Sequence, residues 1–184
     1  MPKPAVFLDR DGVINIDHGY VHDEHEFEFI EGVFEATKQL QEMGYLLVLV
    51  TNQAGIGRGY YTEDRFLSLT QWMDWNFIDN GVEFDGFYYC PHHAEHGLGK
   101  YKQECDCRKP KPGMFLSAKE FLDIDMVNSV MVGDKAEDLM AAEAACVGTK
   151  ILVRTGKPVT DKGESLANVV LDSIKDVPEY IRRS

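Results

Sequence analysis

The chain has 184 residues with a formal charge of −12. This length suits one domain with a full central sheet, so we expect residues 1–184 to form a single domain. The acidic balance and the lack of a basic tract argue against a nucleic-acid partner, because contacts with nucleic-acid phosphates come from clustered Lys and Arg. The N-terminus has no signal-like pattern and no apolar run reaches membrane-spanning length. We therefore expect a cytoplasmic monomer with no membrane partner.

Strand-like and helix-like segments alternate along the chain, which is typical of a mainly parallel sheet with crossover helices. We expect an α/β fold, a Rossmann-like three-layer sandwich. The expected strands are residues 5–8, 46–50, 84–89, 129–132, 151–153 and an edge strand at 169–171, and the expected helices are residues 29–43, 62–80, 114–122, 135–145 and 177–182. Gly44 suits the position just past a helix end, and Thr62 suits an N-cap. Trp72 and Trp75 are predicted to lie in the core.

Asp9 and Asp11 follow directly on the apolar segment 5–8. In an open α/β sheet, ligands bind beyond the carboxyl ends of the strands, so these carboxylates are predicted to lie at a site. They would point the same way and repel, which would raise the pKa of one of them unless a cation binds beside them. This predicts Mg²⁺ on oxygen ligands. An ordinary turn is the alternative, because Asp and Gly are common in turns.

Two further strand ends carry polar side chains. Thr51 begins a polar stretch after the second predicted strand, and its hydroxyl suits a phosphate oxygen. Asp134 follows the fourth predicted strand and would complete a metal site with Asp9, although acids are also favourable at a helix start. Three strand ends that carry Asp-x-Asp, Thr and Gly-Asp favour one shared site over chance.

A glycine-rich segment and a group of cations also indicate anion binding. Gly55, Gly57 and Gly59, with Arg58 among them, predict a loop whose backbone approaches an anion closely. Residues 108–112 place three cations before a helix in an otherwise acidic chain. Phosphate recognition needs such charge, whereas a solvated basic turn is the alternative.

Three of the four cysteines lie between residues 90 and 107. In a reducing compartment this crowding favours a metal site over disulfides. The predicted ligands are Cys90, His92, Cys105 and Cys107, with His93 and His96 as rivals. Four protein ligands suit tetrahedral Zn²⁺ and leave no open position for chemistry, so we expect a structural zinc in a loop at about 90–107. Unrelated thiols and surface histidines are the alternative. Cys146 is predicted to be a small buried apolar residue.

Seven segments spread along nearly the whole chain carry a family resemblance. They are DRDG at 9–12, HGYVH at 18–22, TNQAGI at 51–56, YCPHH at 89–93, CDCRKP at 105–110, MVGDK at 131–135 and RTGKP at 154–158. Together they resemble the haloacid dehalogenase (HAD) superfamily, and within it the histidinol-phosphatase-like subfamily. The resemblance implies a small phosphatase without a large cap domain, and no cap-sized insertion is evident in the chain.

The resemblance implies a Mg²⁺-dependent phosphoric monoester hydrolase. Its implied reaction removes the C7 phosphate of D-glycero-D-manno-heptose 1,7-bisphosphate, on the route to ADP- or GDP-heptose for lipopolysaccharide or surface glycans. Asp9 would attack phosphorus and Asp11 would serve as general acid and base. Thr51 and Lys109 would stabilise the phosphoryl oxygens. Mg²⁺ would bind Asp9, the main-chain carbonyl of Asp11, and Asp134. The preferred anomer at C1 is left open.

Loops would recognise the substrate, because a site without a cap has little else to bind a sugar. The implied substrate-binding residues are Asp17, His18, Gly19, Tyr20, Asn52, Gln53, Ala54, Arg108 and Lys135. Among them, Arg108 would bind the distal C1 phosphate through two oxygens. The predicted zinc would position Arg108 and Lys109 rather than join the chemistry.

Two alternatives to this function are kept. Histidinol-phosphate phosphatases share the acidic opening and the zinc loop, whereas the segments 18–20 and 154–158 favour the heptose substrate. A phospho-acceptor or binding module without turnover is the non-enzyme alternative. The position of Asp11 argues against it, because a durable aspartyl phosphate is incompatible with a general base beside it.

Overall fold

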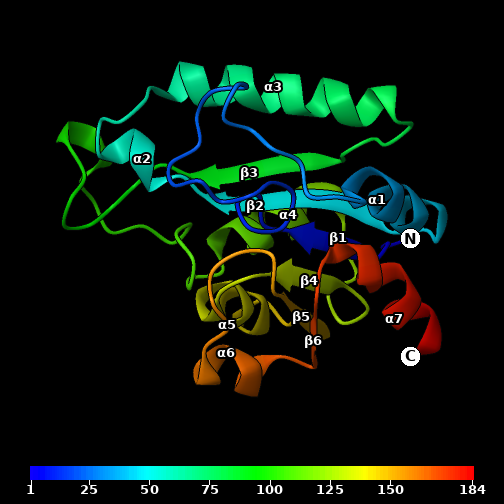
Figure 1. The fold of residues 1–184 in the computed structure, drawn as a ribbon. Helices are drawn as coiled ribbons and strands as arrows, with labels where there is room; N and C mark the ends of the chain where they lie inside the picture. The colour runs from blue at the N-terminus through cyan, green and yellow to red at the C-terminus, as the bar shows by residue number, and fades with distance from the viewer.

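The computed structural model describes residues 1–184 and contains one six-stranded sheet in the order β3-β2-β1-β4-β5-β6 (Figure 1). Every neighbouring pair of strands is parallel, which confirms the predicted α/β class. The strands are β1 (Ala5–Leu8), β2 (Leu46–Asn52), β3 (Gly86–Cys90), β4 (Val130–Gly133), β5 (Thr149–Val153) and β6 (Val169–Leu171).

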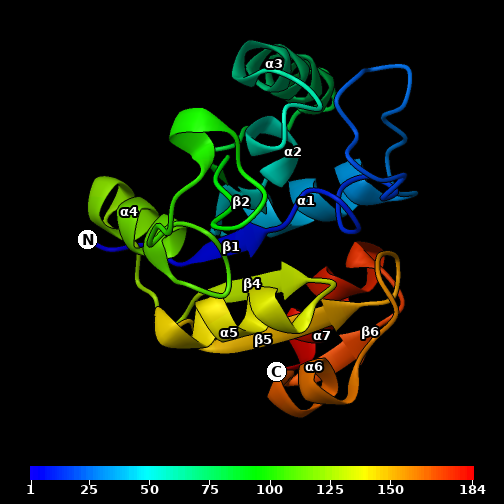
Figure 2. The same ribbon diagram turned by 90° about the vertical axis from the view of Figure 1, so that its left-hand side faces the viewer.

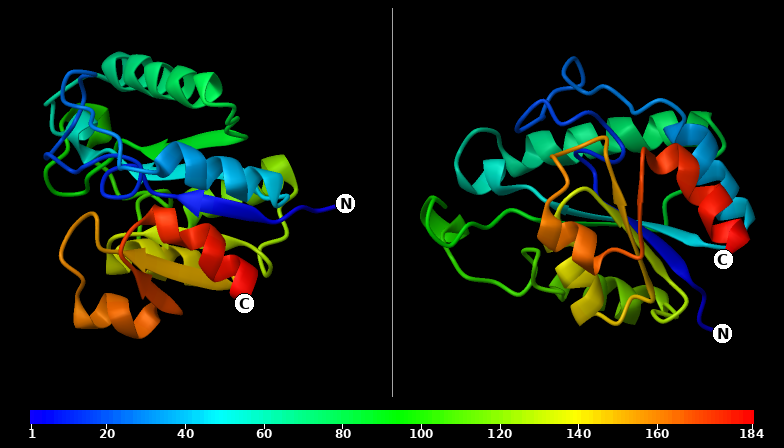
Figure 3. Two further views of the ribbon diagram at one scale, coloured as in Figure 1. Left: turned by 45° about the vertical axis from the view of Figure 1, so that its right-hand side comes forward. Right: turned by 60° about the horizontal axis from the view of Figure 1, so that its bottom comes forward.

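Helices cover both faces of the sheet, so the predicted three layers are present. One face packs against α1 (Val33–Glu42), α3 (Glu63–Asp79) and α7 (Val177–Arg183), two of which, α1 and α7, lie in front of the strands in the left view of Figure 3. The other face packs against α4 (Gly113–Leu122), α5 (Ala136–Ala144) and α6 (Asp161–Leu166), as Figure 2 shows for α4 and α5. The short elements are α2 (Ala54–Gly57) and the 3₁₀ turns η1 (Gly99–Tyr101) and η2 (Ile174–Asp176).

The position of β1 in the centre of the sheet explains why residues 5–8 are all apolar. Val6 and Leu8 belong to the core on one face of the sheet, and Ala5 and Phe7 belong to the core on the other. All four side chains are fully buried. A strand that is covered on both faces needs apolar residues at every position, because successive side chains point to opposite faces.

Tertiary packing corrects two predictions of burial. Trp75 is 57% exposed, because the buried side of α3 carries Phe66, Met73 and Phe77, and Trp75 lies on the other side of the helix. Trp72 is half-buried and packs against the core that contains Val6 and Leu8. Cys146 is exposed rather than buried, because it lies in the turn after α5 with a φ of 65°.

Several predicted boundaries also change. The helix expected at 29–43 begins only at Val33, after Gly32 with a φ of 82°. Strand β2 continues two residues beyond its predicted end, so Thr51 and Asn52 belong to the strand. The helix α6 was not predicted, although Thr160 is its N-cap and accepts a hydrogen bond from Gly163.

The loops that follow the strands meet at the carboxyl ends of the sheet, on the left in Figure 1. Neither the segment between β1 and α1 nor the segment between β3 and α4 builds a layer of its own over the sheet, in agreement with the absence of a large cap. No helix combines the length and the apolar character needed to cross a membrane.

Candidate active site

Three buried carboxylates meet at the carboxyl ends of β1 and β4. Asp9 follows β1, Asp134 follows β4, and Asp138 lies in the first turn of α5. Their oxygen atoms lie within 4.8 Å of one another. The expected proximity of Asp9 and Asp134 is therefore present. Asp138 joins them, and its Oδ2 accepts hydrogen bonds from the backbone of Asp134 and Lys135. Asp138 therefore has both roles: it is an acid in the first turn of a helix, where negative charge is favourable, and it is a member of the carboxylate cluster.

Lys109 supplies the positive charge at this cluster. Its side chain is 2% exposed, and its Nζ lies 3.1 Å from Asp9 Oδ1 and 2.7 Å from Asp138 Oδ1. It also donates to the carbonyl of Val50 at 2.9 Å. Burial alone would lower the pKa of Lys109, but the two carboxylates hold that pKa above its usual range. The ammonium group therefore stays charged at neutral pH.

One ammonium group does not neutralise three carboxylates. Burial, followed by the charges of Asp9 and Asp138, raises the pKa of Asp134 from 3.8 to about 8. Burial and Asp138 also raise the pKa of Asp9. Asp134 Oδ1 is buried without a hydrogen-bond partner. A hard divalent cation fits this donor set, because it binds carboxylate oxygens and would satisfy the unpaired one.

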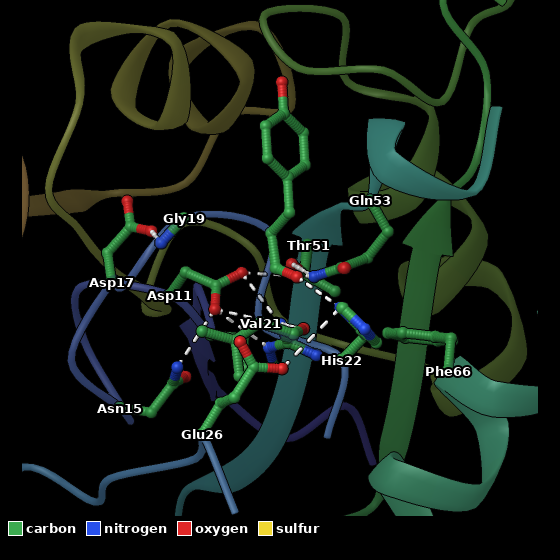
Figure 4. A network of polar contacts seen from close by, with 12 residues as sticks. Asp11, Asn15, Asp17, Gly19, Val21, His22, Glu26, Thr51, Gln53 and Phe66 are labelled. Carbon is green, nitrogen blue, oxygen red and sulfur yellow. Dashed lines mark hydrogen bonds and ion pairs between the residues drawn. The ribbon is translucent and has the colours of Figure 1, made fainter. Parts of the chain in front are cut away.

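Asp11 lies apart from this cluster in a polar network of its own (Figure 4). Its carboxylate accepts from Arg10 at 2.9 Å, Asn15 at 3.0 Å and Gln53 at 3.2 Å. Burial would raise the pKa of Asp11, but Arg10 and these hydrogen bonds hold it below its usual range. The sequence predicted that one carboxylate of the pair would have a raised pKa. That carboxylate is Asp9 and not Asp11, because Arg10 points its guanidinium group at Asp11.

A cavity of about 270 Å³ opens above these groups. Eight of the nine implied substrate-binding residues line it: Asp17, Gly19, Tyr20, Asn52, Gln53, Ala54, Arg108 and Lys135. His18 does not line it, since its ring lies 3.3 Å from Glu28 at the surface. Asp11 and Lys109 reach the cavity wall. Asp9 is 4% exposed and Thr51 is 1% exposed, so both are covered more deeply.

Three lining residues had no predicted role. Lys157 places its Nζ 3.3 Å from Asp17, and its backbone donates to Asp134 at 2.8 Å. Glu137 and Tyr61 also line the cavity. The RTGKP segment at 154–158 could have indicated Lys157, because this segment resembles the family and none of its residues had been given a role. Gly156 in this segment packs directly on the Asp134 carboxylate, where any side chain would overlap with it.

The side-chain amides of Asn52 and Gln53, at the end of β2, form hydrogen bonds mainly with other residues of the protein. Asn52 accepts from the backbone N–H of Lys109 at 3.0 Å and donates to its carbonyl at 3.2 Å. Gln53 donates to Asp11 and to Thr51. These side chains therefore fix the positions of two charged residues at the cavity.

The glycine segment 55–59 is not an open anion-binding loop. Gly55 and Gly57 lie in the short helix α2 and are buried. Gly55 packs on the ring of Tyr61, and Gly57 packs on the carbonyl of Pro91. These glycines allow close packing rather than close approach of an anion, although Gly55 also lines the cavity.

A second cluster lies in the loop between β3 and α4. It contains Cys90, His92, Cys105 and Cys107, the four predicted ligands. His93 instead accepts hydrogen bonds at its Nδ1 from the backbone of Glu95 and His96. The structure thus places His92, and neither rival, in the cluster.

The geometry of this cluster is close to that of a tetrahedral site. The Sγ atom of Cys105 lies 3.5 Å from that of Cys90 and 3.4 Å from that of Cys107, and His92 Nδ1 lies 3.5–3.6 Å from two sulfurs. Zn–S bonds of about 2.3 Å place the corners of a tetrahedron roughly 3.8 Å apart. The Cys90–Cys107 pair is closer, at 2.8 Å. All four cysteines are free thiols, and the cluster is compatible with zinc.

Known proteins are similar to this chain. A HAD-hydrolase-like family model matches residues 106–177, which include Lys109, Asp134 and Asp138. A D-glycero-beta-D-manno-heptose-1,7-bisphosphate 7-phosphatase from Vibrio cholerae serotype O1 is 81% identical, over 100% of this chain and 98% of its own length. The chain belongs to this phosphatase family.

Other members agree. The heptose-bisphosphate phosphatase of Escherichia coli K12 is 58% identical, over 98% of this chain and 94% of its own length. The crystal structure of D,D-heptose 1,7-bisphosphate phosphatase from B. bronchiseptica, in complex with magnesium and phosphate, superposes with a TM-score of 0.82. It is 28% identical and covers 98% of each chain. The family membership confirms the predicted resemblance to HAD phosphatases.

Proposed function

We propose that this protein is a Mg²⁺-dependent phosphatase that hydrolyses the C7 phosphate of D-glycero-β-D-manno-heptose 1,7-bisphosphate. The observation that carries the proposal is the buried cluster of Asp9, Asp134 and Lys109 beneath a cavity with further cations at its wall. The 81% identical relative is named for this reaction and for the β anomer. The B. bronchiseptica relative holds magnesium and phosphate.

In the proposed mechanism, the Asp9 carboxylate attacks phosphorus and forms an aspartyl phosphate as the C7 oxygen leaves. In the free protein Arg10 holds the pKa of Asp11 low, and the negative charge of the bound phosphate would raise that pKa again. Asp11 would then give a proton to the C7 oxygen and afterwards take one from the water that hydrolyses the intermediate. Lys109 and Thr51 stabilise the charge on the phosphoryl oxygens. Asp9, the Asp11 main-chain carbonyl and Asp134 would hold Mg²⁺, which supplies positive charge against the repulsion between carboxylate and phosphate.

The sugar and its distal phosphate would occupy the cavity. Asp17 and Tyr20 form one wall of it, and Arg108 and Lys135 bring positive charge to it. We assign the C1 phosphate to Arg108, because a planar guanidinium group can bind two oxygens together. The Zn²⁺ cluster would hold the loop that ends at Arg108. We further propose that residues 1–184 act as one domain, as a cytoplasmic monomer, with no nucleic-acid or membrane partner.

The test is phosphate release with Mg²⁺ from heptose 1,7-bisphosphate beside histidinol phosphate, with phosphorus NMR to identify the ester that is cleaved. We expect preferential cleavage at C7 and faster turnover of the β anomer. Preference for histidinol phosphate would retain the mechanism and overturn the substrate. No turnover of either compound would favour the binding-module alternative.

Mg²⁺ affinity is expected to depend on pH. In the metal-free protein the Asp134 carboxyl keeps its proton up to a pKa of about 8, and Mg²⁺ binds only the carboxylate. Affinity should therefore fall by up to about tenfold per pH unit below 8 and level off above it. Calorimetric titrations at several pH values, in buffers with different ionisation enthalpies, would detect the released proton. A pH-independent affinity would contradict the prediction, and Asp134→Asn should abolish the proton release.

Loss of zinc is expected to weaken substrate binding more than chemistry. Cys107→Ser removes one predicted ligand, so the loop that carries Arg108 loses its constraint. One charge-assisted contact is worth about 1.5–3 kcal/mol, so KM for the bisphosphate should rise roughly 10- to 100-fold. Zinc content by mass spectrometry and steady-state kinetics measure both effects. The matched control is Cys146→Ser, since this exposed thiol lies outside the cluster. Zinc loss without a change in KM would contradict the prediction.

A further inference from the structure

Arg10 is an arginine in the core beside the active site, in a position that the proposed mechanism does not use. It is 1% exposed. Its guanidinium carbon lies 5.7 Å from the ring centroid of Phe27 and 5.9 Å from that of Phe66. Burial of a charge is costly unless hydrogen bonds and a partner charge compensate for it. Such a residue needs a specific set of partners.

The partners of Arg10 are Asp11 and the backbone at Val21, both of which Figure 4 labels. Its Nε donates to Asp11 Oδ1 at 3.2 Å, and one terminal nitrogen donates to Asp11 Oδ1 at 2.9 Å and Oδ2 at 3.1 Å. The same nitrogen donates to the carbonyl of Val21 at 2.7 Å. One guanidinium group therefore contacts both oxygens of Asp11 and the backbone of the loop that forms a cavity wall.

The loop at residues 17–22 has an unusual backbone conformation, which contacts with residues outside the loop stabilise. Gly19 and Tyr20 both adopt positive φ, of 85° and 50°, and a positive φ is uncommon for a tyrosine. Tyr20 lines the cavity, and its carbonyl accepts only from the ring of His22 next to it. Arg10 holds this loop through Val21, and Arg65 on α3 holds it through the carbonyl of His22 at 2.9 Å.

We propose that Arg10 is a positioning residue that fixes the Asp11 carboxylate toward the leaving oxygen and couples it to the substrate loop at residues 17–22. A planar fork can contact both oxygens of a carboxylate and fix its rotation, whereas an ammonium group contacts it as a point charge. This inference rests on the proposed role of Asp11 as general acid. Arg10 itself does not contact the cavity.

The test exploits the need of the leaving group for a proton. An alkoxide such as the heptose C7 oxygen needs a general acid, whereas p-nitrophenolate leaves without one. Arg10→Lys and Arg10→Gln should lower kcat for heptose 1,7-bisphosphate by roughly 10- to 100-fold, part of the 10²–10⁴-fold that a general acid contributes. The same variants should retain, within about threefold, the rate at which p-nitrophenyl phosphate phosphorylates Asp9, measured as the initial burst of p-nitrophenol, because Asp11 acts as a base only in the later hydrolysis step. The burst amplitude gives the concentration of active sites, so both rates are expressed per active site.

Arg65→Lys is the matched control, because Arg65 anchors the same loop but does not contact Asp11. It should raise KM for the bisphosphate with kcat and the ratio of rates unchanged. Asp11→Asn removes the general acid completely, so it sets the largest change that can be expected in the ratio of the rate with the bisphosphate to the rate with p-nitrophenyl phosphate.

An equal loss of both rates in the Arg10 variants would overturn the inference, because it would indicate a general effect on the fold. A change in KM alone would also overturn it, because it would leave only the loop contact. If the wild-type protein does not hydrolyse the bisphosphate, the proposed function fails instead, and the two failures are distinguishable.

Discussion

Asp9→Asn is expected to abolish turnover, with a loss on the order of 10⁴-fold or more, as is found when an enzyme nucleophile is removed. The amide has nearly the shape of the carboxylate, but its oxygen is a poor nucleophile. Asp9 is 4% exposed and lies beside Lys109, so a carboxylate from solution cannot reach its position and replace it as the nucleophile. Steady-state phosphate release at saturating Mg²⁺ measures the effect.

Mass spectrometry after an acid quench provides the direct readout for the covalent step. Wild-type protein should carry one phosphoryl group on Asp9 during turnover, and Asp9→Asn should carry none. Asp11→Asn is the matched variant, because it retains the nucleophile and should still become phosphorylated by an activated ester such as p-nitrophenyl phosphate. Substantial turnover by Asp9→Asn would show that the covalent mechanism is wrong.

Lys109→Met is expected to damage both stability and catalysis. The methionine fills most of the space of the lysine stem but leaves Asp9 and Asp138 buried without their shared cation. Removal of one partner from a buried ion pair costs roughly 3–5 kcal/mol of unfolding free energy. Loss of a charge directed at the phosphoryl oxygens should lower kcat by a further ~10²- to 10³-fold.

Urea unfolding and kinetics well below the melting temperature separate these two effects. Lys111→Met is the control, since Lys111 is exposed two residues away in the same basic segment and should be nearly silent in both assays. Normal kcat in Lys109→Met would remove Lys109 from the mechanism. Normal stability would show that the buried carboxylates become protonated in the variant at little cost.

The candidate site could be predicted largely because the protein places its charged residues directly after apolar strands. Asp9 and Asp134 follow β1 and β4, and neighbouring parallel strands bring their carboxyl ends together. The members of the Cys/His cluster could be predicted because Cys90 and Cys107, with their neighbours, form two close pairs. In both cases the chemistry of residue types at short spacing carried the signal.

The contacts of single side chains could not be predicted in this way. The spacing of Asp9 and Asp11 gave no sign that Arg10 binds one of them and Lys109 the other, so the raised pKa was not assigned to a particular carboxylate. Asp138 could not be placed in the cluster, because an acid in a first helical turn is common without a metal. The orientation of α3, which exposes Trp75, depends on which side of the helix meets the sheet.

The sequence by itself determined the α/β class, the order of its main elements and most members of the two clusters that could hold a metal, because apolar periodicity and the spacing of Cys, His and Asp are local properties of the chain. Only the tertiary structure decided which charges share a partner. The pairings of Lys109 with two carboxylates and of Lys157 with Asp17 join residues from different loops. Arg10 pairs with its neighbour in the chain, Asp11, and the packing of the loop decides that it faces Asp11 rather than Asp9. Charge pairing depends on distance and burial, and both are set only when the strands pack and their loops meet.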